Sequence, residues 1–462
     1  RREGEESVKQ YDVILIGTGQ ATGTMLPAFL KMGKSVATVE KDRVGGTCVN
    51  WGCTPTKTLV AGARAAHMVR RAGDFGIEVS DYRVDFPAAM ERQNRNRERS
   101  NAQFQKWLEE TTDFYQGEAS FVSEHEVRVG DDTIRGETIY IHTGATARVP
   151  PIPGIDEVAY LDNKGILSLS ELPEHLIVIG GSYVGLEFSQ VFRRFGSKVT
   201  VLERGPRIMS REDEDVAEEA TRILASEGIE FVHNVEVESV SPEGGVTVRA
   251  TVAGEEKRIS GSHLLMATGR KPQIEALNLP AAGVEVDGRG FIKVNEYLQT
   301  AAPHIYAVGD VNGGSAFTHT SVHDGQIIVK NLEGRDWRRG DRIPIYAMFM
   351  DPPLGRVGMN EDQARTSGRR VLKGVMPMSS IARAREKDET AGLVKVLVEA
   401  DSGQLLGATV FGTGGDEVVN LLATWMYTRL PYTELQKAVL VHPTVAELMP
   451  YVFENLEPLE SS

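Results

Sequence analysis

The sequence contains only two cysteines among its 462 residues, Cys48 and Cys53. So sparse a use of cysteine excludes a small secreted fold that depends on several disulfides. No apolar run approaches the roughly 20 residues that a membrane-spanning helix needs. The first residues, RREGEESVKQ, are charged and lack the apolar core of a secretory signal. We therefore expect a cytoplasmic protein with no membrane partner.

An excess of positive charge is also lacking. The formal net charge is −14, and a protein that binds nucleic-acid phosphates needs a basic surface, so we expect no nucleic-acid partner. The hydrophobic fraction of 41% and the charged fraction of 25% are those of a globular chain. The length is enough for two or three domains.

Both cysteines lie in one short segment, GGTCVNWGCTPTK, at residues 45–57. A disulfide here would close a small loop and restrict the unfolded chain little, so a structural staple is a weak interpretation. A metal site needs more ligands than this segment offers. A redox dithiol is favoured. Pro55 suits the first turn of a helix whose pattern continues to Gly73. Cys53 would then lie at the helix N-terminus, where the helix dipole and the nearby charge of Lys57 favour a thiolate.

Residues 11–42 have the pattern strand, glycine-rich turn, helix, strand, which is typical of dinucleotide-binding folds. Gly17 and Gly19 fill the first two glycine positions of the motif, and Thr22 stands at the third. Glycines at these positions let backbone amides and a helix N-terminus meet a pyrophosphate. Glu40 ends the next strand, where a carboxylate accepts from ribose hydroxyls. An ordinary tight turn between strand and helix is the alternative.

The same pattern recurs at residues 174–204. Gly180 and Gly185 hold the first and third positions, with Ser182 in the second. Glu203 follows Gly180 by 23 residues, the same spacing that separates Gly17 from Glu40. Two such folds predict two dinucleotides, one held tightly and one exchanging. A dithiol directly after the first fold would lie against the redox ring of the first nucleotide.

Two later segments also carry candidate residues. In TAAPHIYAVGDVNGG a strand is expected to end at Gly309–Asp310, and Asp310 could accept from polyol hydroxyls or form a plain Asx turn. From about Tyr346 the pattern is that of an α+β domain. Near its end, VHPTVAELMP places His442 and Glu447 five residues apart. A carboxylate-oriented imidazole could move protons for a thiol at neutral pH, and a purely structural histidine is the alternative.

The dithiol segment, the two dinucleotide folds, ATGR, YAVGD and the terminal HPTVAE occur in an order that resembles the FAD-dependent pyridine nucleotide–disulfide oxidoreductases over nearly the whole chain. The resemblance implies an α/β protein with two Rossmann-like domains, for FAD and NAD(P), and an α+β C-terminal dimerisation domain. The implied boundaries are 1–150 and 275–345 for the FAD domain with its central region, 151–274 for the NAD(P) domain, and 346–462 for the dimer-interface domain.

The resemblance also implies a role for each matching residue. Cys53 would be the thiol next to the flavin and Cys48 the interchange thiol that attacks substrate. Lys57 and Glu187 would pair near flavin N5 and the nicotinamide. His442 with Glu447 would be an acid–base couple that reaches the dithiol of the other subunit. The expected FAD-binding positions are Gly17, Gly19, Glu40, Gly46, Thr47, Thr143, Gly144 and Asp310; those for NAD(P) are Gly180, Ser182, Gly185, Glu203, Arg204 and Gly269; no metal site is expected.

Within the family, PTKTLVA, MFMDPPLGRVGMNEDQARTSG and IARARE resemble mercuric-reductase-like proteins and bacterial reductases of reactive chlorine and hypothiocyanous acid. Mercuric reductases carry a C-terminal cysteine pair, and this sequence ends YVFENLEPLESS without one. We therefore expect poor turnover of Hg(II). Dihydrolipoamide dehydrogenases usually have a histidine where Leu440 stands.

We therefore expect a homodimeric enzyme that uses FAD and NADH or NADPH. It would pass electrons through the flavin to a Cys48–Cys53 disulfide and on to a small thiol, oxidant or electrophile, in detoxification. Glu203 favours NADH, since a carboxylate there repels a 2′-phosphate, although Arg204 and Arg207 lie close enough to offset the repulsion. The alternatives are a mercuric reductase, a dihydrolipoamide dehydrogenase-like enzyme and a non-catalytic redox-sensing flavoprotein.

Overall fold

The computed structural model describes residues 8–460, so the first seven residues of the charged N-terminal stretch, and residues 461–462, lie outside it. The described chain divides into two compact units. Unit 1 contains residues up to 58, 91–148 and 269–342; unit 2 contains 59–90, 149–268 and the chain from 343 onward. Among the described residues, no helix combines the length and the apolar character needed to cross a bilayer.

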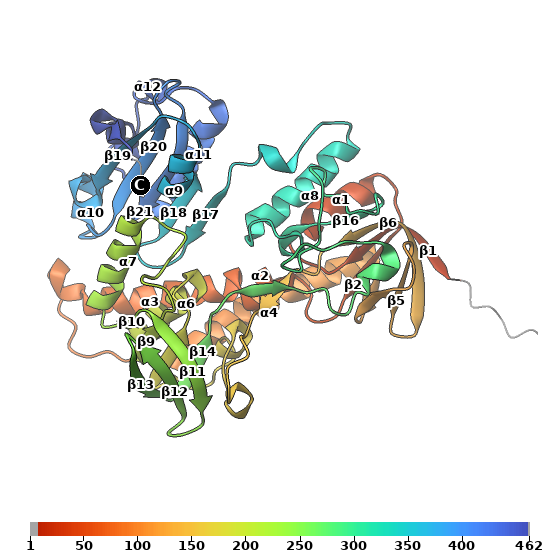
Figure 1. The fold of residues 1–462 in the computed structure, drawn as a ribbon, viewed down its shortest axis with the longest axis horizontal. Helices are drawn as coiled ribbons and strands as arrows, with labels where there is room; N and C mark the ends of the chain where they lie inside the picture. The colour runs from red at the N-terminus through yellow and green to blue at the C-terminus, as the bar shows by residue number, and fades with distance from the viewer. Residues whose placement is uncertain (1–7, 461–462) are drawn as a thin grey trace, which may run out of the picture. The chain divides into compact units, whose positions relative to one another are not determined.

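Unit 1 is organised around a seven-stranded sheet whose central strands are parallel (Figure 1) and contain buried runs at residues 13–16 and 36–40. Burial on both faces explains why these strands are apolar runs such as VILI and VATV. Helices α1 (Thr22–Lys31) and α8 (Thr318–Leu332) pack on each other and on this sheet. The strands, in the order β3-β2-β1-β6-β5-β4 with β16 beside β6, are β3 (Asp113–Gln116), β2 (Val36–Glu40), β1 (Lys9–Ile16), β6 (Asp132–Ile141), β5 (Glu126–Val129), β4 (Ala119–Phe121) and β16 (Ile305–Ala307). A two-stranded ladder joins β7 (Ala145–Ala147) to β15 (Arg270–Pro272).

Unit 2 contains the second parallel sheet. Helix α6 (Tyr183–Phe195) packs on it with the apolar face of an amphipathic helix, and α7 (Glu214–Ser226) joins the same core. The sheet order is β10 (Glu230–Val232), β9 (Lys198–Leu202), β8 (His175–Ile179) and β14 (His263–Met266). An antiparallel sheet of β11 (Val235–Ser241), β12 (Val246–Val252) and β13 (Glu255–Gly261) follows α7 and β10 in the chain.

The C-terminal part of unit 2 is a mainly antiparallel sheet with helices, as the α+β pattern predicts (Figure 1). Helix α11 (Gly415–Thr428) packs on β18 and β21. The strand order is β17 (Ile345–Met348), β18 (Leu354–Gly358), β21 (Leu405–Phe411), β20 (Leu393–Glu399), β19 (Val371–Pro377) and β22 (Glu457–Pro458). The shorter helices are α5 (Asn163–Ile166), α9 (Glu361–Thr366), α10 (Ala382–Glu386), α12 (Tyr432–Leu435) and the 3₁₀ segment Ala446–Asn455.

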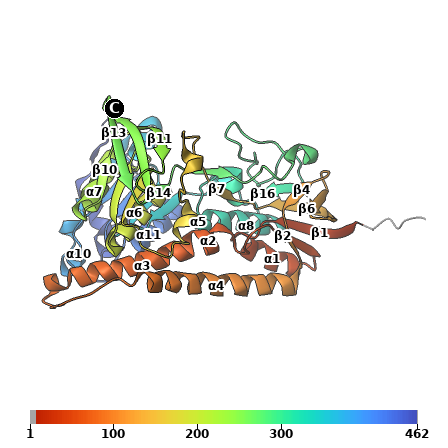
Figure 2. The same cartoon turned by 90° about the horizontal axis from the view of Figure 1, so that it is seen from below.

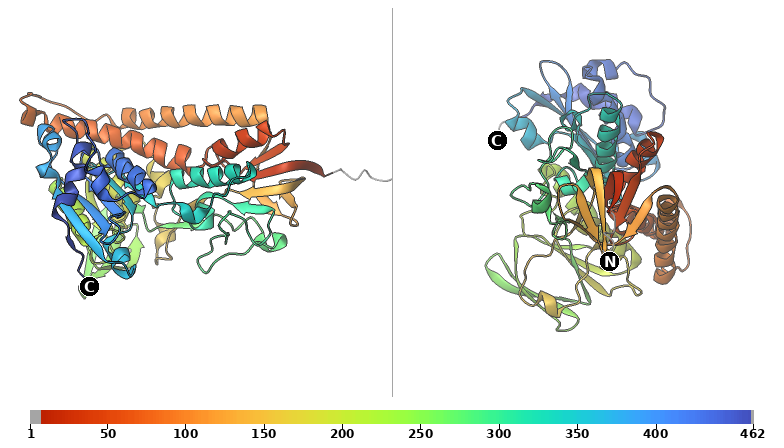
Figure 3. Two further views of the ribbon diagram at one scale, coloured as in Figure 1. Left: turned by 90° about the horizontal axis from the view of Figure 1, so that it is seen from above. Right: turned by 90° about the vertical axis from the view of Figure 1, so that its right-hand side faces the viewer.

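The dithiol segment forms two helices, α2 (Gly46–Trp51) and α3 (Cys53–Arg70). Figures 2 and 3 show α4 (Phe86–Thr111) as one long, unbroken helix. Two sequence-based boundaries were wrong. Helix α3 ends at Arg70 before Gly73, and a 3₁₀ turn, Ala72–Phe75, follows it. The strand before Asp310 ends at Ala307, because Gly309 takes a φ of 76° that a strand cannot continue through.

Candidate active site

The two cysteines lie at the junction of α2 and α3. Cys48 is within α2, and Cys53 is the first residue of α3. The pKa of Cys48 is raised above its ordinary value, first by its hydrogen bond to Cys53 and then by burial. The hydroxyl of Thr318 and the charge of Lys57 act in the opposite direction on this pKa. The two sulfurs are therefore hydrogen-bond neighbours, and Cys48 needs a proton acceptor before it can act as a nucleophile.

Thr318 is a site residue that the sequence analysis missed. It is the first residue of α8, and its Oγ1 lies 3.4 Å from Sγ of Cys53. Because it is 265 positions away from Cys53, no local pattern connects the two. The available signal was a threonine at the start of a helix that follows the glycine-rich stretch after Asp310.

The first glycine-rich turn is a cradle that only glycine can build. A Cβ on Gly17 would lie 2.2 Å from the carbonyl oxygen of His142, and one on Gly19 would lie 2.5 Å from Nε2 of the same histidine. A Cβ on Gly46 would lie 3.0 Å from Cα of Gly19. Glu40 ends β2 next to this turn, and its Oε2 accepts a hydrogen bond from the Thr18 hydroxyl at 2.6 Å. A turn without side chains at Gly17 and Gly19 lets a pyrophosphate approach its backbone closely.

His142 is the second residue that the sequence analysis missed. It is buried, its Nε2 accepts from the amide of Ala21 at 3.2 Å, and its Nδ1 bonds the carbonyl of Val308 at 3.0 Å. Because Nε2 accepts and Nδ1 faces a carbonyl oxygen, Nδ1 carries the proton; burial lowers the pKa of this histidine. The imidazole thus links the glycine-rich turn to the segment that carries Asp310. A polar residue directly after the buried strand β6 was the only signal in the sequence.

Arg270 lies near two of the other expected FAD positions in unit 1. Arg270 lies 3.5 Å from the Thr47 hydroxyl through Nη2 and 3.7 Å from the carboxylate of Asp310. The Thr143 hydroxyl donates to the carbonyl of Gln273 at 2.7 Å. Gly144 has a φ of 68°. Arg270 was not among the expected residues, and it connects two of them.

The second glycine-rich turn repeats the geometry of the first in unit 2. A Cβ on Gly180 would lie 2.1 Å from the carbonyl oxygen of Ala267, and one on Gly185 would lie 2.2 Å from the carbonyl of Gly180. Ser182 is the N-cap of α6. Glu203 follows β9, and its two carboxylate oxygens accept from the amides of Gly181 at 2.8 Å and Gly205 at 2.7 Å. Arg204 is exposed beside it, and Gly269, with a φ of 108°, belongs to unit 1.

Glu187 and Lys57, the pair expected near the flavin, lie in different units. Glu187 is buried in α6, where its Oε1 accepts from the backbone amide of Phe349 at 2.8 Å. Lys57 is one turn after Cys53 in α3. Their pairing stays a prediction.

His442 and Glu447 are hydrogen-bonded to each other. Nδ1 of His442 lies 2.8 Å from Oε1 of Glu447, which also accepts from the amide of Thr444 at 3.3 Å. The His442 side chain is 73% exposed, and Val439 and Val441 beside it are also exposed. The ring is therefore oriented by a carboxylate and open to a second molecule.

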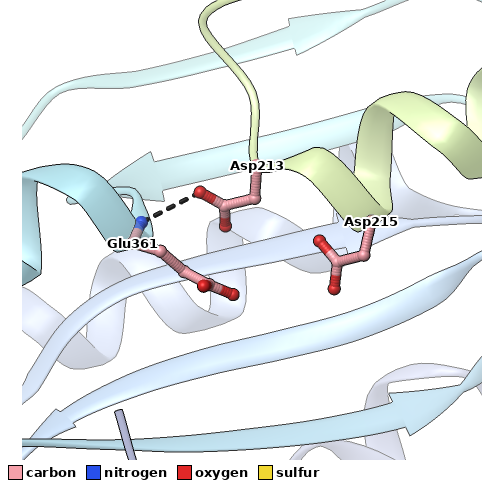
Figure 4. Close-up of side chains that lie close together, drawn as sticks. All are labelled: Asp213, Asp215 and Glu361. Carbon is pink, nitrogen blue, oxygen red and sulfur yellow. Dashed lines mark hydrogen bonds between the residues drawn. The ribbon is translucent and has the colours of Figure 1, made fainter. Parts of the chain in front are cut away.

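Three carboxylates elsewhere in unit 2 lie close enough to hold a cation (Figure 4). They belong to Asp213, Asp215 and Glu361, and the Glu361 amide donates to Asp213 at 2.9 Å. The buried ammonium of Lys395 reaches all three, at 3.1, 2.6 and 2.6 Å. This ammonium supplies the positive charge that the carboxylates require.

Comparison with known proteins identifies the class. The chain belongs to the pyridine nucleotide-disulphide oxidoreductase family, whose model matches residues 11–325, and the dimerisation domain of that family matches residues 345–452. The protein is therefore an oxidoreductase that uses FAD and NAD(P)H, and the second match supports a homodimer.

Comparison with individual proteins shows which members of this family the chain resembles. The chain is 36% identical to the probable pyridine nucleotide-disulfide oxidoreductase RclA of Escherichia coli, over 96% of this chain and 99% of that protein. The solved copper(II) complex of RclA, an HOCl-induced flavoprotein disulfide reductase, matches with a TM-score of 0.88 over the same shares of the two chains. A mercuric reductase of Bacillus cereus is 32% identical over 96% of this chain and 71% of its own length.

The residues present fit FAD in unit 1. The absence of side chains at Gly17 and Gly19 lets the glycine-rich turn pack tightly on His142, and Glu40 places a carboxylate at the end of β2, as in dinucleotide-binding folds. When bound, FAD would supply a flavin ring that accepts a hydride and passes its two electrons on, one at a time or together.

Proposed function

We propose that this enzyme reduces a small, strong oxidant of the hypochlorous or hypothiocyanous acid type and so protects the cell, acting in the cytoplasm. One observation carries the proposal: Cys48 and Cys53 are hydrogen-bonded neighbours, in a chain similar over nearly its whole length to an HOCl-induced flavoprotein disulfide reductase. Residues 1–150 with 275–345 would hold FAD, 151–274 would hold NAD(P)H, and 346–462 would form the dimer.

The two cysteines and one histidine would each have a separate role in the reaction. Cys48 attacks the oxidant and Cys53 then closes the disulfide. Because the pKa of Cys48 is raised by its hydrogen bond to Cys53 and by burial, a base must remove its proton. His442 of the partner subunit suits this step, since the ring is exposed and oriented by a carboxylate.

For hypothiocyanous acid the dithiol steps balance. The Cys48 thiolate takes the SCN group from HOSCN and hydroxide leaves, so a sulfenyl thiocyanate forms. The Cys53 thiolate then attacks the Cys48 sulfur, thiocyanate leaves, and the disulfide forms. Two electrons from NADH restore the dithiol, and the net change is HOSCN + NADH → SCN⁻ + NAD⁺ + H₂O.

The remaining site residues would bind the cofactors. Gly17, Gly19, Glu40, Gly46, Thr47, Thr143, Gly144 and Asp310 would contact FAD, and Gly180, Ser182, Gly185, Glu203, Arg204 and Gly269 would contact NAD(P)H. Thr318 and His142 join this set from the contacts described above. Lys57 and Glu187 would lie beside the flavin and nicotinamide.

A panel of electron acceptors tests the proposal. NADH oxidation should be fastest with hypothiocyanite, and slow with lipoamide, glutathione disulfide and quinones. A higher kcat/KM with lipoamide than with hypothiocyanite would contradict it. Failure of NADH to reduce the bound flavin at all would instead favour the non-catalytic alternative.

A further inference from the structure

Three polar side chains form a buried stripe along one face of α6. They are Glu187, Gln190 and Arg194, and their spacing of three and four residues places them on the same side of the helix. Each residue is only 3% exposed. Burying three polar groups is costly unless each finds hydrogen-bond partners. All three bind one short segment of unit 2, residues 349–351.

Side chains of the stripe form hydrogen bonds to the backbone of this segment. Glu187 accepts from the amide of Phe349 at 2.8 Å. Gln190 accepts from the amide of Asp351 and donates to its carbonyl, both at 2.7 Å. One residue separates Phe349 from Asp351, so a short stretch of backbone joins the two sets of hydrogen bonds. The position of Phe349, which binds Glu187, therefore depends on how Asp351 is held.

Two arginines hold the Asp351 carboxylate. Arg64 of α3 lies 2.7 Å from Oδ1, and Arg194 of α6 lies 2.5 Å from Oδ2. Arg194 also makes two hydrogen bonds of 2.8 Å to Glu227, and Arg64 also bonds Glu389. Charge-assisted bonds to both carboxylate oxygens are among the strongest that a side chain can make.

We propose that Asp351 is a positioning residue for Glu187: the Arg64–Asp351–Arg194 cluster fixes residues 349–351 along α6, so that the Phe349 amide holds the Glu187 carboxylate in one place. The inference rests on the proposed function, in which Glu187 lies beside the flavin and nicotinamide. Loss of this cluster, called the Asp351 clamp below, would then slow hydride transfer from NADH and leave the dithiol chemistry unchanged.

The test compares two clamp variants with a matched control. Asp351→Asn removes the charge that both arginines bind, and Arg64→Met removes one arginine. Arg71→Met is the control, because Arg71 lies directly after α3 and pairs with Asp74 and Asp388 instead of Asp351. Should Asp351→Asn fail to fold, Arg64→Met carries the test alone.

Two quantities are measured. The first is hydrogen–deuterium exchange of the peptide that contains Phe349, in protein with and without FAD. The second is the rate of flavin reduction by NADH in stopped flow, at matched FAD content. We expect faster exchange and flavin reduction about 10- to 100-fold slower in both clamp variants, with Arg71→Met like wild type. The rate at which hypothiocyanite reoxidises the reduced enzyme should be unchanged.

A double-mutant cycle separates positioning from a general structural effect. Asp351→Asn combined with Glu187→Gln should reduce the flavin no more slowly than Glu187→Gln alone, because both changes act on one interaction. Additive losses would overturn the proposal, as would a wild-type rate of flavin reduction in a clamp variant whose exchange is accelerated. A wild-type rate in Glu187→Gln would overturn it as well, while oxidant turnover by the wild-type enzyme would leave the proposed function standing.

Discussion

The hydroxyl of Thr318 offers a direct test of how the dithiol is tuned. It lies 3.4 Å from Sγ of Cys53 and lowers the pKa of Cys48. Thr318→Val keeps the shape of the side chain and removes this hydroxyl. A hydrogen bond of this kind contributes about 1 kcal/mol net, which corresponds to about 0.7 pKa unit. We therefore expect the pKa of Cys48 to rise further in the valine variant, by about that amount.

The sign follows from the thiolate being the reactive form. At a pH well below the pKa, a rise of about 0.7 unit lowers the thiolate fraction about five-fold. Alkylation of the reduced enzyme by iodoacetamide should slow by the same factor, and fragmentation of the peptide that spans residues 44–57 locates the label on Cys48. Thr318→Ser retains the hydroxyl and should react like wild type. A valine variant that alkylates at the wild-type rate or faster would refute the reasoning.

Three further outcomes are expected. His442→Ala should lower turnover roughly 10²- to 10⁴-fold, as expected when a general acid–base group is removed. Mixed dimers of His442→Ala and Cys48→Ser subunits should keep the activity of one complete site, and folded heterodimers without activity would count against a site shared between subunits. NADH should be preferred over NADPH, because two backbone amides hold the Glu203 carboxylate at the end of β9, where it repels a 2′-phosphate. The measurement is kcat/KM for the two cofactors, and a large preference for NADPH would contradict the prediction. Hg(II) should be a poor substrate, since two thiolates bind a soft cation tightly and the sequence has no third cysteine to accept it; rapid release of Hg(0) at low thiol concentration would contradict this and restore the mercuric reductase alternative.

The parts of the fold that the sequence predicted are those encoded over short stretches. Strand, glycine-rich turn, helix and strand follow within about 30 residues in each dinucleotide fold, so apolar runs and glycine positions are sufficient. The ends of α3 and of β16 were misplaced by two or three residues, because a 3₁₀ turn continues a helix or strand pattern without a clear break.

The site residues that the sequence missed act over long separations. Thr318 contacts Cys53 from 265 positions away, and His142 binds the Ala21 amide from 121 positions away. Neither lies in a motif of its own. The clamp on Asp351 is similar, since its arginines come from α3 and α6. Such contacts depend on how the elements pack, which periodicity and spacing alone do not specify.

The central claim is that electrons reach the oxidant through Cys48 and Cys53. The most direct test is the turnover of hypothiocyanite with NADH by Cys48→Ser, measured beside wild type at equal FAD content. We expect the variant to keep its flavin, to let NADH reduce it, and to lose hypothiocyanite turnover. Turnover at the wild-type rate by Cys48→Ser would contradict the account.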